Sequence, residues 1–434
     1  MDNSKLENII INIAYDDINK QNLSYLEFDP QWIHDIKDND IKYIKWTQVD
    51  NYLPNLTNTF RKNTTEYYCN SNSNFIYPIN LYTNEFFLKY STIDFDLKLV
   101  ESVKRKKARI VFFYNTEGDW GTHSYQFNWM NNLVMKYQFE SDDIIVVNSN
   151  LKSKENYKES LFTIIPYNFF LINLDFIPLN KSNRNEIKRY EKNYVKYIDV
   201  NRSTKKTKHF LCLNGEPRLN RLLMFGELHT NPNLENKFIT SLRNTTLNNI
   251  NKFYEDVLGN TTNDNIVNFF KNYNSLQPYV YDRMVFGKWI HWHLSVNEEA
   301  HMSSFVNIVT ESLFNSESIF ITEKTYKPMY MCQPFIIFGN PNLLKKLKEY
   351  GFKTFDKWWD ESYDDELDLD IRFAKISKVL NEISKWDSDK CFQITNEMED
   401  ILIHNFRQVL KNSELLKLYQ SLQTDISDTK PTLL

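Results

Sequence analysis

The sequence predicts an α/β fold with two Rossmann-like domains that face each other across a cleft, followed by C-terminal helices. Two observations lead to this prediction. Short apolar runs rich in β-branched and aromatic residues alternate with polar or helix-like stretches, which is typical of buried parallel strands covered by helices. These runs also fall into two series, separated by a polar stretch from 180 to 208 that is dense in Asn, Lys and Arg. Ligands usually bind between such domains.

The first series begins with the run Ala108-Arg-Ile-Val-Phe-Phe-Tyr114, which is apolar enough for a buried strand. The runs 143–147 and 162–165 have the same character, and 169–174 is a further candidate. Before them, residues 1–100 are polar and aromatic, and no element is assigned there.

The second series opens with a strand at 209–213, a polar loop and a helix over 222–228. A strand followed by a loop and a helix N-terminus is the arrangement that binds anions in α/β folds. Three further strands are predicted at 304–309, 318–321 and 334–338.

Helices are predicted for most of the remaining sequence. After the last strand, Asn340 and Pro341 supply an N-cap and a first-turn proline, and Gly351 a stop. Apolar residues at helical spacing predict a helix over 371–386, and helices continue to about residue 419.

These patterns divide the 434 residues into four parts. We predict an N-terminal region of unassigned fold at 1–100, a Rossmann-like domain at 101–205, a second Rossmann-like domain at 206–385, and C-terminal helices and tail at 386–434.

Composition excludes several classes of protein. The net charge of -4 disfavours a nucleic-acid binder that relies on basicity. Only eight glycines are present and none forms a G-x-G pair, so the dinucleotide fingerprint and the P-loop are absent. A bound nucleotide would therefore have its phosphates held by side chains and helix ends.

The cysteines and the hydropathy bear on the compartment. The four cysteines are scattered with no C-x-x-C pair, which argues against a zinc site or a disulfide framework. Residues 1–20 carry four acidic residues and do not resemble a signal peptide, and no apolar run approaches the ~18 residues of a membrane span. We expect a cytoplasmic protein with no integral membrane segment.

The most distinctive segment runs from Phe305 to Gly339. A strand ends in Thr310-Glu311-Ser312, and Thr322 is placed to cap a helix that contains Glu323 and Lys324. Lysines beside a helix N-terminus form a site for a diphosphate, and a carboxylate there can accept hydrogen bonds from sugar hydroxyls. Pro328 lies too deep for an uninterrupted helix, so we expect a kink or a later start. Without further support, a capped surface helix is the commoner explanation.

The pattern Thr-Glu-Ser, then Ile-Thr-Glu-Lys-Thr-Tyr, then a strand ending in Gly resembles the donor-binding motif of the α-1,3-fucosyltransferase family. A form with Lys-Pro after the core and Gly-Phe-Lys-Thr-Phe downstream is similar to uncharacterised viral and bacterial glycosyltransferase-like proteins. The family has Asn where this chain has Glu311, and small residues where it has Pro328 and Met329. The resemblance implies the two-domain GT-B fold, in which 101–205 is the acceptor-side domain and 206–385 binds the nucleotide sugar. A role in acceptor recognition is assigned to 1–100 from its position alone.

Two weaker similarities lie in the order that the family requires. The strand ending in Asn214 and followed by Arg221 is similar to a strand ending in Ser-Asn before a pyrophosphate-binding Arg, and Arg218 competes for that role. The run from Ile110 to Gly118 resembles the strand that precedes the family's general base. By this similarity Glu117 would be the base. A Glu at the end of a strand is more often an exposed loop residue.

The resemblance implies an inverting, metal-independent glycosyltransferase with a nucleotide-sugar donor, GDP-fucose first, and a glycan acceptor. Arg221 or Arg218 and Lys324 would neutralise the diphosphate, and Glu323 would bind ribose or sugar hydroxyls. The other donor-binding candidates are Asn214, Glu311 and Tyr326. Glu117 would deprotonate the acceptor, with Asp119 and His123 as alternatives.

Two rival functions stay open. The chain could transfer another activated group onto a surface glycan, or it could be a non-catalytic glycan-binding or virion structural protein that keeps the fold.

Other candidate residues have commoner structural explanations. His291, His293 and His301 could form a metal site, although surface or core histidines are more frequent. Asp368 and Asp370 match the Asp-x-Asp spacing of metal-dependent glycosyltransferases, but helix capping fits their position better. The tryptophans at 289, 292, 358 and 359 could stack on sugars, with core packing as the default.

Overall fold

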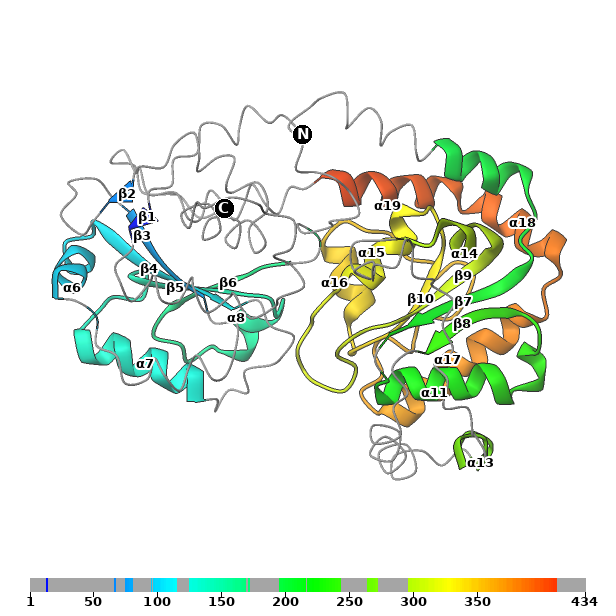
Figure 1. Ribbon diagram of the computed structural model, residues 1–434, viewed down its shortest axis with the longest axis horizontal. Coiled ribbons are helices and arrows are strands. Elements are labelled where there is room, and N and C mark those ends of the chain that lie inside the picture. The colour runs from blue at the N-terminus through cyan, green and yellow to red at the C-terminus, as the bar shows by residue number, and fades with distance from the viewer. Residues whose placement is uncertain are drawn as a thin grey trace, which may run out of the picture. The chain divides into compact units, whose positions relative to one another are not determined.

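The computed structural model describes residues 13–14, 66–67, 75–80, 95, 97–114, 125–168, 171, 195–215, 217–242, 264–271 and 296–411. The chain divides into two compact units, each with its own sheet (Figure 1). The first contains the described residues up to 171, and the second those from 195 to 411.

The sheet of the first unit has the strand order β2-β1-β3-β4-β5-β6, and all of its described pairings are parallel. The predicted strand at 108–114 is confirmed, and those at 143–147 and 162–165 are each shifted by one residue. The candidate strand at 169–174 lies outside the described residues except for Leu171. The elements are β1 (Ile13–Ala14), β2 (Glu66–Tyr67), β3 (Phe75–Asn80), α6 (Leu97–Lys104), β4 (Ala108–Tyr114), α7 (Tyr125–Tyr137), β5 (Ile144–Asn148), α8 (Ser153–Asn156) and β6 (Thr163–Pro166).

Burial explains why these strands form. The side chains of Ile110 and Phe112 on β4 and of Ile144 and Val146 on β5 are all removed from solvent. Phe112 packs edge to face on Trp129 of α7, with ring centroids 5.5 Å apart. A strand buried by helices reads as a continuous apolar run, and this is the pattern that predicted it.

The sheet of the second unit has the order β10-β9-β7-β8 and is also parallel throughout. Within this unit, α11 and α17 lie on one side of the sheet and α15 and α19 on the other (Figure 1). The elements are β7 (Lys208–Asn214), α11 (Leu219–Thr230), η2 (Pro232–Leu234), β8 (Phe238–Leu242), α13 (Asp264–Lys271), α14 (Glu298–Ser303), β9 (Ser304–Thr310), α15 (Glu323–Tyr330), β10 (Phe335–Phe338), α16 (Leu343–Glu349), α17 (Leu369–Ser384), α18 (Ser388–Glu397) and α19 (Glu399–Lys411).

The predicted fold class is confirmed, because both units are parallel sheets flanked by helices and helices follow the second sheet. The cleft between the domains stays a prediction. Strand β8 was not predicted, since its sequence Phe-Ile-Thr-Ser-Leu mixes polar with apolar residues.

Two local predictions in the second unit were wrong. Residues 318–321 form no strand: they are buried in the connection between β9 and α15, and an apolar run alone does not distinguish the two states. Helix α16 is capped at Asn342, in the left-handed region at φ 64°, and not at Asn340. Helix α15 starts at Glu323 and contains Pro328, which excludes the later start, and the kink at Pro328 stays a prediction.

Two other predicted signals for helix ends are confirmed. Gly351 has φ 82° directly after α16, as expected for a helix stop. Asp368 caps α17 by accepting hydrogen bonds from the backbone N–H groups of Asp370 and Ile371, 3.0 Å each. The Asp-x-Asp spacing therefore belongs to a helix start.

Two sets of contacts involve residues that lie just before the predicted domain boundaries. β3 pairs with β4, which brings residues before 101 into the first sheet. The helical residues 195–203 belong to the second unit: Asn201 Nδ2 donates to the Cys332 carbonyl at 2.9 Å, and Arg202 pairs with Glu399. They stand before the predicted boundary at 205.

Within the described part of the chain, no helix combines the length and the apolar character needed to cross a membrane.

Candidate functional site

Two connections meet at the carboxyl edge of the second sheet. One joins β7 to α11 (residues 215–218), and the other joins β9 to α15 (residues 311–322). Because the strands are parallel, their carboxyl ends lie at one edge, where open α/β sheets bind ligands.

Buried amides tie the strand ends together. The Thr310 hydroxyl donates to Asn214 Oδ1, which joins the ends of β9 and β7. Asn220, in the first turn of α11, donates from Nδ2 to the carbonyls of Glu311 (2.9 Å) and Phe338 (3.1 Å). Asn220 was missed by the sequence analysis, although an amide beside Arg221 in the mostly apolar first turns of a helix was a usable signal.

Glu311 is 0% exposed and its carboxylate is saturated by the chain itself. It accepts hydrogen bonds from the backbone N–H of Ser312 (3.2 Å) and of Thr322 (3.0 Å) and from the hydroxyls of Thr322 (2.6 Å) and Thr325. In the structure Glu311 links the start of α15 to the end of β9, and its predicted donor-binding role stays a prediction.

The predicted cap of α15 is confirmed. Thr322 has extended backbone angles, and its hydroxyl oxygen accepts from the N–H of Lys324 at 3.3 Å. The Lys324 side chain is 26% exposed, and its Nζ lies 3.2 Å from Thr322 Oγ1, 3.1 Å from Glu323 Oε1 and 3.5 Å from Ser312 Oγ. The charge of Lys324 is thus held at the helix N-terminus, while part of the side chain is exposed to solvent.

Glu323 is buried beside this lysine. Burial by itself would raise the pKa of its carboxyl, but the charges of Lys324 and Lys327 outweigh burial and lower the pKa to about 2. Glu323 is therefore ionised at neutral pH, and both oxygens of an ionised carboxylate can accept hydrogen bonds from hydroxyls.

The two candidate arginines occupy different environments. Arg218 is half-buried, precedes α11, and donates from Nη1 to the Ser312 carbonyl at 2.5 Å. Arg221 is only 3% exposed inside the first turns of α11. Ser312 thus brings Arg218 and Lys324 together, one through its carbonyl and the other through its hydroxyl.

Asn214 and Tyr326 lie in the interior. Asn214 joins the strand ends, with its backbone N–H donating to Ser241 Oγ at 3.1 Å. The Tyr326 ring is fully buried and packs against Phe352, with ring centroids 5.8 Å apart. Both side chains are buried inside the second unit.

Several other candidates lie outside the described residues: Glu117, Asp119, His123, His291, His293, Trp289 and Trp292. His301 is buried, its Nδ1 lies 2.7 Å from Gln333 Oε1, and burial lowers its pKa to about 4. Over the ranges that the structure describes, no cluster of His, Cys, Asp and Glu has the form of a metal site. Trp359 is a core residue, while Trp358 donates to Glu397 Oε2 at 3.2 Å.

The arrangement favours an anion. Two cationic side chains converge on Ser312, and the helices α11 and α15 both begin there, with their N-termini contributing partial positive charge. A carboxylate, Glu323, stands next to them. Such a site can hold a phosphate or diphosphate and also accept a hydroxyl hydrogen bond.

No protein-family profile matches the sequence, and no curated protein matches it. Among solved structures, the chain is similar to an α,α-trehalose 6-phosphate synthase from Burkholderia multivorans, with TM-score 0.39 and 8% identity over 93% of this chain and 81% of that chain. It is also similar to a UDP-forming α,α-trehalose-phosphate synthase from Burkholderia vietnamiensis, with TM-score 0.38 and 9% identity over 93% of this chain and 83% of that chain. Likenesses of this strength say nothing about the ligand or activity of this chain.

Proposed function

We propose that this chain is a glycosyltransferase that moves a sugar from a nucleoside-diphosphate sugar onto a hydroxyl of a glycan acceptor. The observation that carries the proposal is the convergence of Arg218 and Lys324 on Ser312, at the N-termini of α11 and α15. The resemblance of residues 305–339 to the donor motif of α-1,3-fucosyltransferases supports the same assignment.

In the proposed donor complex, the diphosphate lies between these two cations and the two helix ends. Charge develops on the departing diphosphate in the transition state, and fixed cations there lower the barrier. We assign this role to Arg218 ahead of Arg221, because Arg218 is the more exposed and contacts Ser312. The side chains supply the positive charge, so we expect donor binding to persist when divalent metals are chelated.

Glu323 is the proposed acceptor of ribose or sugar hydroxyls. Its carboxylate is ionised, is oriented by Lys324 at 3.1 Å, and lies in the first turn of α15. Asn214, Glu311 and Tyr326 then position this edge of the sheet without touching the donor.

The acceptor hydroxyl needs a base. We propose Glu117 for this role in an inverting displacement, because it follows β4 as the family's base follows the corresponding strand. GDP-fucose is the first donor to test, on the strength of the motif alone.

The experiment that tests this function is a thermal-shift screen against GDP, UDP, CDP, ADP and their sugar conjugates, since a ligand that binds the native state raises its stability. The proposal predicts stabilisation by one nucleoside diphosphate, lost in Lys324→Ala and kept in Lys378→Ala, which removes an exposed lysine of α17. If millimolar nucleotides leave the wild-type transition unmoved, the non-catalytic glycan-binding alternative takes its place.

A further inference from the structure

Arg372 is a buried cation that the proposed chemistry does not use. It lies on α17, is 1% exposed, and its Nε has no hydrogen-bond partner. Burying a guanidinium costs several kcal/mol, and an apolar side chain of similar volume often packs equally well. A role beyond filling the core is therefore worth testing at this position.

The guanidinium joins two connections. Nη1 donates to the Glu366 carbonyl at 2.8 Å, and Nη2 donates to the Phe314 carbonyl. The nearby carboxylates of Asp364, Glu366 and Asp368 favour its positive charge. A planar fork with separate donors can span two carbonyls in this way, whereas a lysine ammonium concentrates its donors on one atom.

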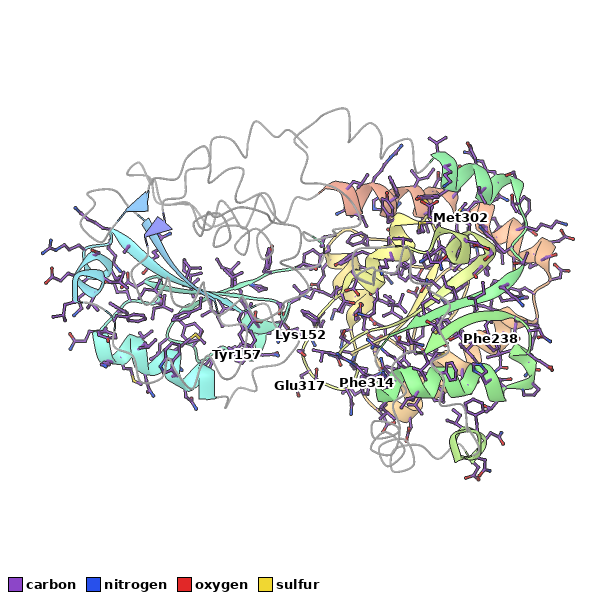
Figure 2. The ribbon with its side chains drawn as sticks, in the orientation of Figure 1. Lys152, Tyr157, Phe238, Met302, Phe314 and Glu317 are labelled. Carbon is purple, nitrogen blue, oxygen red and sulfur yellow. The ribbon has the colours of Figure 1, made fainter. Side chains whose placement is uncertain are left out.

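Phe314 belongs to the connection between β9 and α15. Figure 2 labels Phe314 and Glu317, which both lie in this connection. Two residues before Phe314, Ser312 contacts Arg218 and Lys324. Further along, Asn340 holds the segment by donating from Nδ2 to the Ser318 carbonyl at 2.7 Å. The hydrogen bond from Arg372 therefore holds the connection at Phe314, between Ser312, which contacts Arg218 and Lys324, and Ser318, which Asn340 holds.

We propose that Arg372 is a positioning residue for the donor site, which holds Ser312 in place through the Phe314 carbonyl. The inference rests on the proposed function for its ligand, and on the geometry alone for the anchoring. A displacement of Ser312 separates Arg218 from Lys324, and a misplacement of about 1 Å can cost up to ~100-fold in a binding or catalytic step.

The test compares Arg372→Met, which keeps an unbranched side chain that can fill most of the apolar space and removes both hydrogen bonds, with Arg372→Lys and with the control Lys378→Met. Lys378 is exposed on the same helix, so its variant loses the same charge away from the connection. We expect Arg372→Met to weaken GDP or UDP binding by about tenfold or more in calorimetry below its melting temperature, and Arg372→Lys to lie between. Lys378→Met should bind as the wild type does.

Amide hydrogen exchange without nucleotide supplies a second readout. Loss of the anchor predicts faster exchange confined to 312–318, while β7, β9 and α17 keep their protection. If Arg372→Met folds poorly, Arg372→Lys carries both measurements.

The outcomes separate the two claims. Wild-type protein that binds none of these nucleotides contradicts the proposed function, and the exchange data still decide the anchoring. Variants at Arg372 with wild-type affinity and wild-type exchange at 312–318 overturn the positioning role, even when the wild type binds nucleotide. A uniform rise of exchange over the second unit also overturns it, because it shows a general contribution to stability.

Discussion

The two connections at the edge of the second sheet differ in how far their polar groups and helix starts are hydrogen-bonded within the chain. Between β9 and α15, Glu311 accepts four hydrogen bonds and Thr322 caps the helix, so its polar groups have partners within the chain. Between β7 and α11, the helix begins after Arg218, and no side chain in the described residues caps it. One connection is a scaffold that presents Lys324, and the other supplies the uncapped helix N-terminus at which we propose that the diphosphate binds.

The glycines of this edge show the same difference. A Cβ on Gly339, after β10, would lie 2.8 Å from Leu343 Cδ1 and 3.2 Å from Glu311 Cβ. A Cβ on Gly215, after β7, would meet nothing within 4 Å. The scaffold connection is thus closely packed against β10, whereas space remains beside the start of α11.

The largest effect is expected for Glu311→Ala. At least two buried N–H groups, those of Ser312 and Thr322, lose their acceptor, so the free energy of unfolding should fall by about 3 kcal/mol or more. Urea denaturation measures the change, and nucleotide binding should be lost with it. Glu317→Ala removes an exposed carboxylate from the same connection and should stay within about 0.5 kcal/mol of the wild type; equal effects at 311 and 317 would contradict the scaffold assignment.

The next effect is a dependence of stability on pH. Glu323 has a folded-state pKa of about 2 against an ordinary 4.5, so its ionised form stabilises the native state above the ordinary pKa. That stability, up to about 3 kcal/mol, is lost as the pH falls from about 5 towards 2.

Denaturation of Glu323→Gln over the same pH range is the check. The variant should be less stable than the wild type at neutral pH, and the two curves should converge in acid. Parallel curves would mean that Lys324 does not hold Glu323 ionised.

The glycine pair provides a direct comparison of the connections. Gly339→Ala should lower the free energy of unfolding by about 1–3 kcal/mol, because the new methyl group overpacks against Leu343 and Glu311. Gly215→Ala should leave stability within about 0.5 kcal/mol and weaken nucleotide binding. Unchanged affinity in Gly215→Ala would place the ligand away from the β7–α11 connection.

The smallest effect separates the arginines. Arg218→Ala should weaken GDP or UDP binding by about tenfold, near 1.4 kcal/mol, with little change in stability, because the side chain is half-buried. Arg221→Ala should act mainly on stability, since that side chain is buried. The reverse pattern in calorimetry and denaturation would return the diphosphate role to Arg221.

The sequence predicted those parts of the fold whose signal is local. Runs such as 108–114 and 304–309 are apolar because helices bury the strands, and this signal needs no tertiary information. Thr322 and Asp368 were found as caps because a cap is recognised by its own helix start. Strand β8 lacked such a run.

The roles of the site residues could be assigned only from tertiary contacts. Glu311 stood in the right motif, but only the folded chain shows that its oxygens serve Ser312, Thr322 and Thr325. The choice between Arg218 and Arg221 required burial and the contact with Ser312. Asn220 and Arg372 reach main-chain carbonyls far away in sequence, and a carbonyl carries no sequence signature.

The central claim is that a nucleoside diphosphate binds across both connections, and amide hydrogen exchange with and without saturating GDP or UDP tests it most directly. The account predicts protection at residues 218–221, at the start of α11, together with 312–324, both reduced in Lys324→Ala. Binding with protection elsewhere in the chain, and none at these two segments, would contradict it.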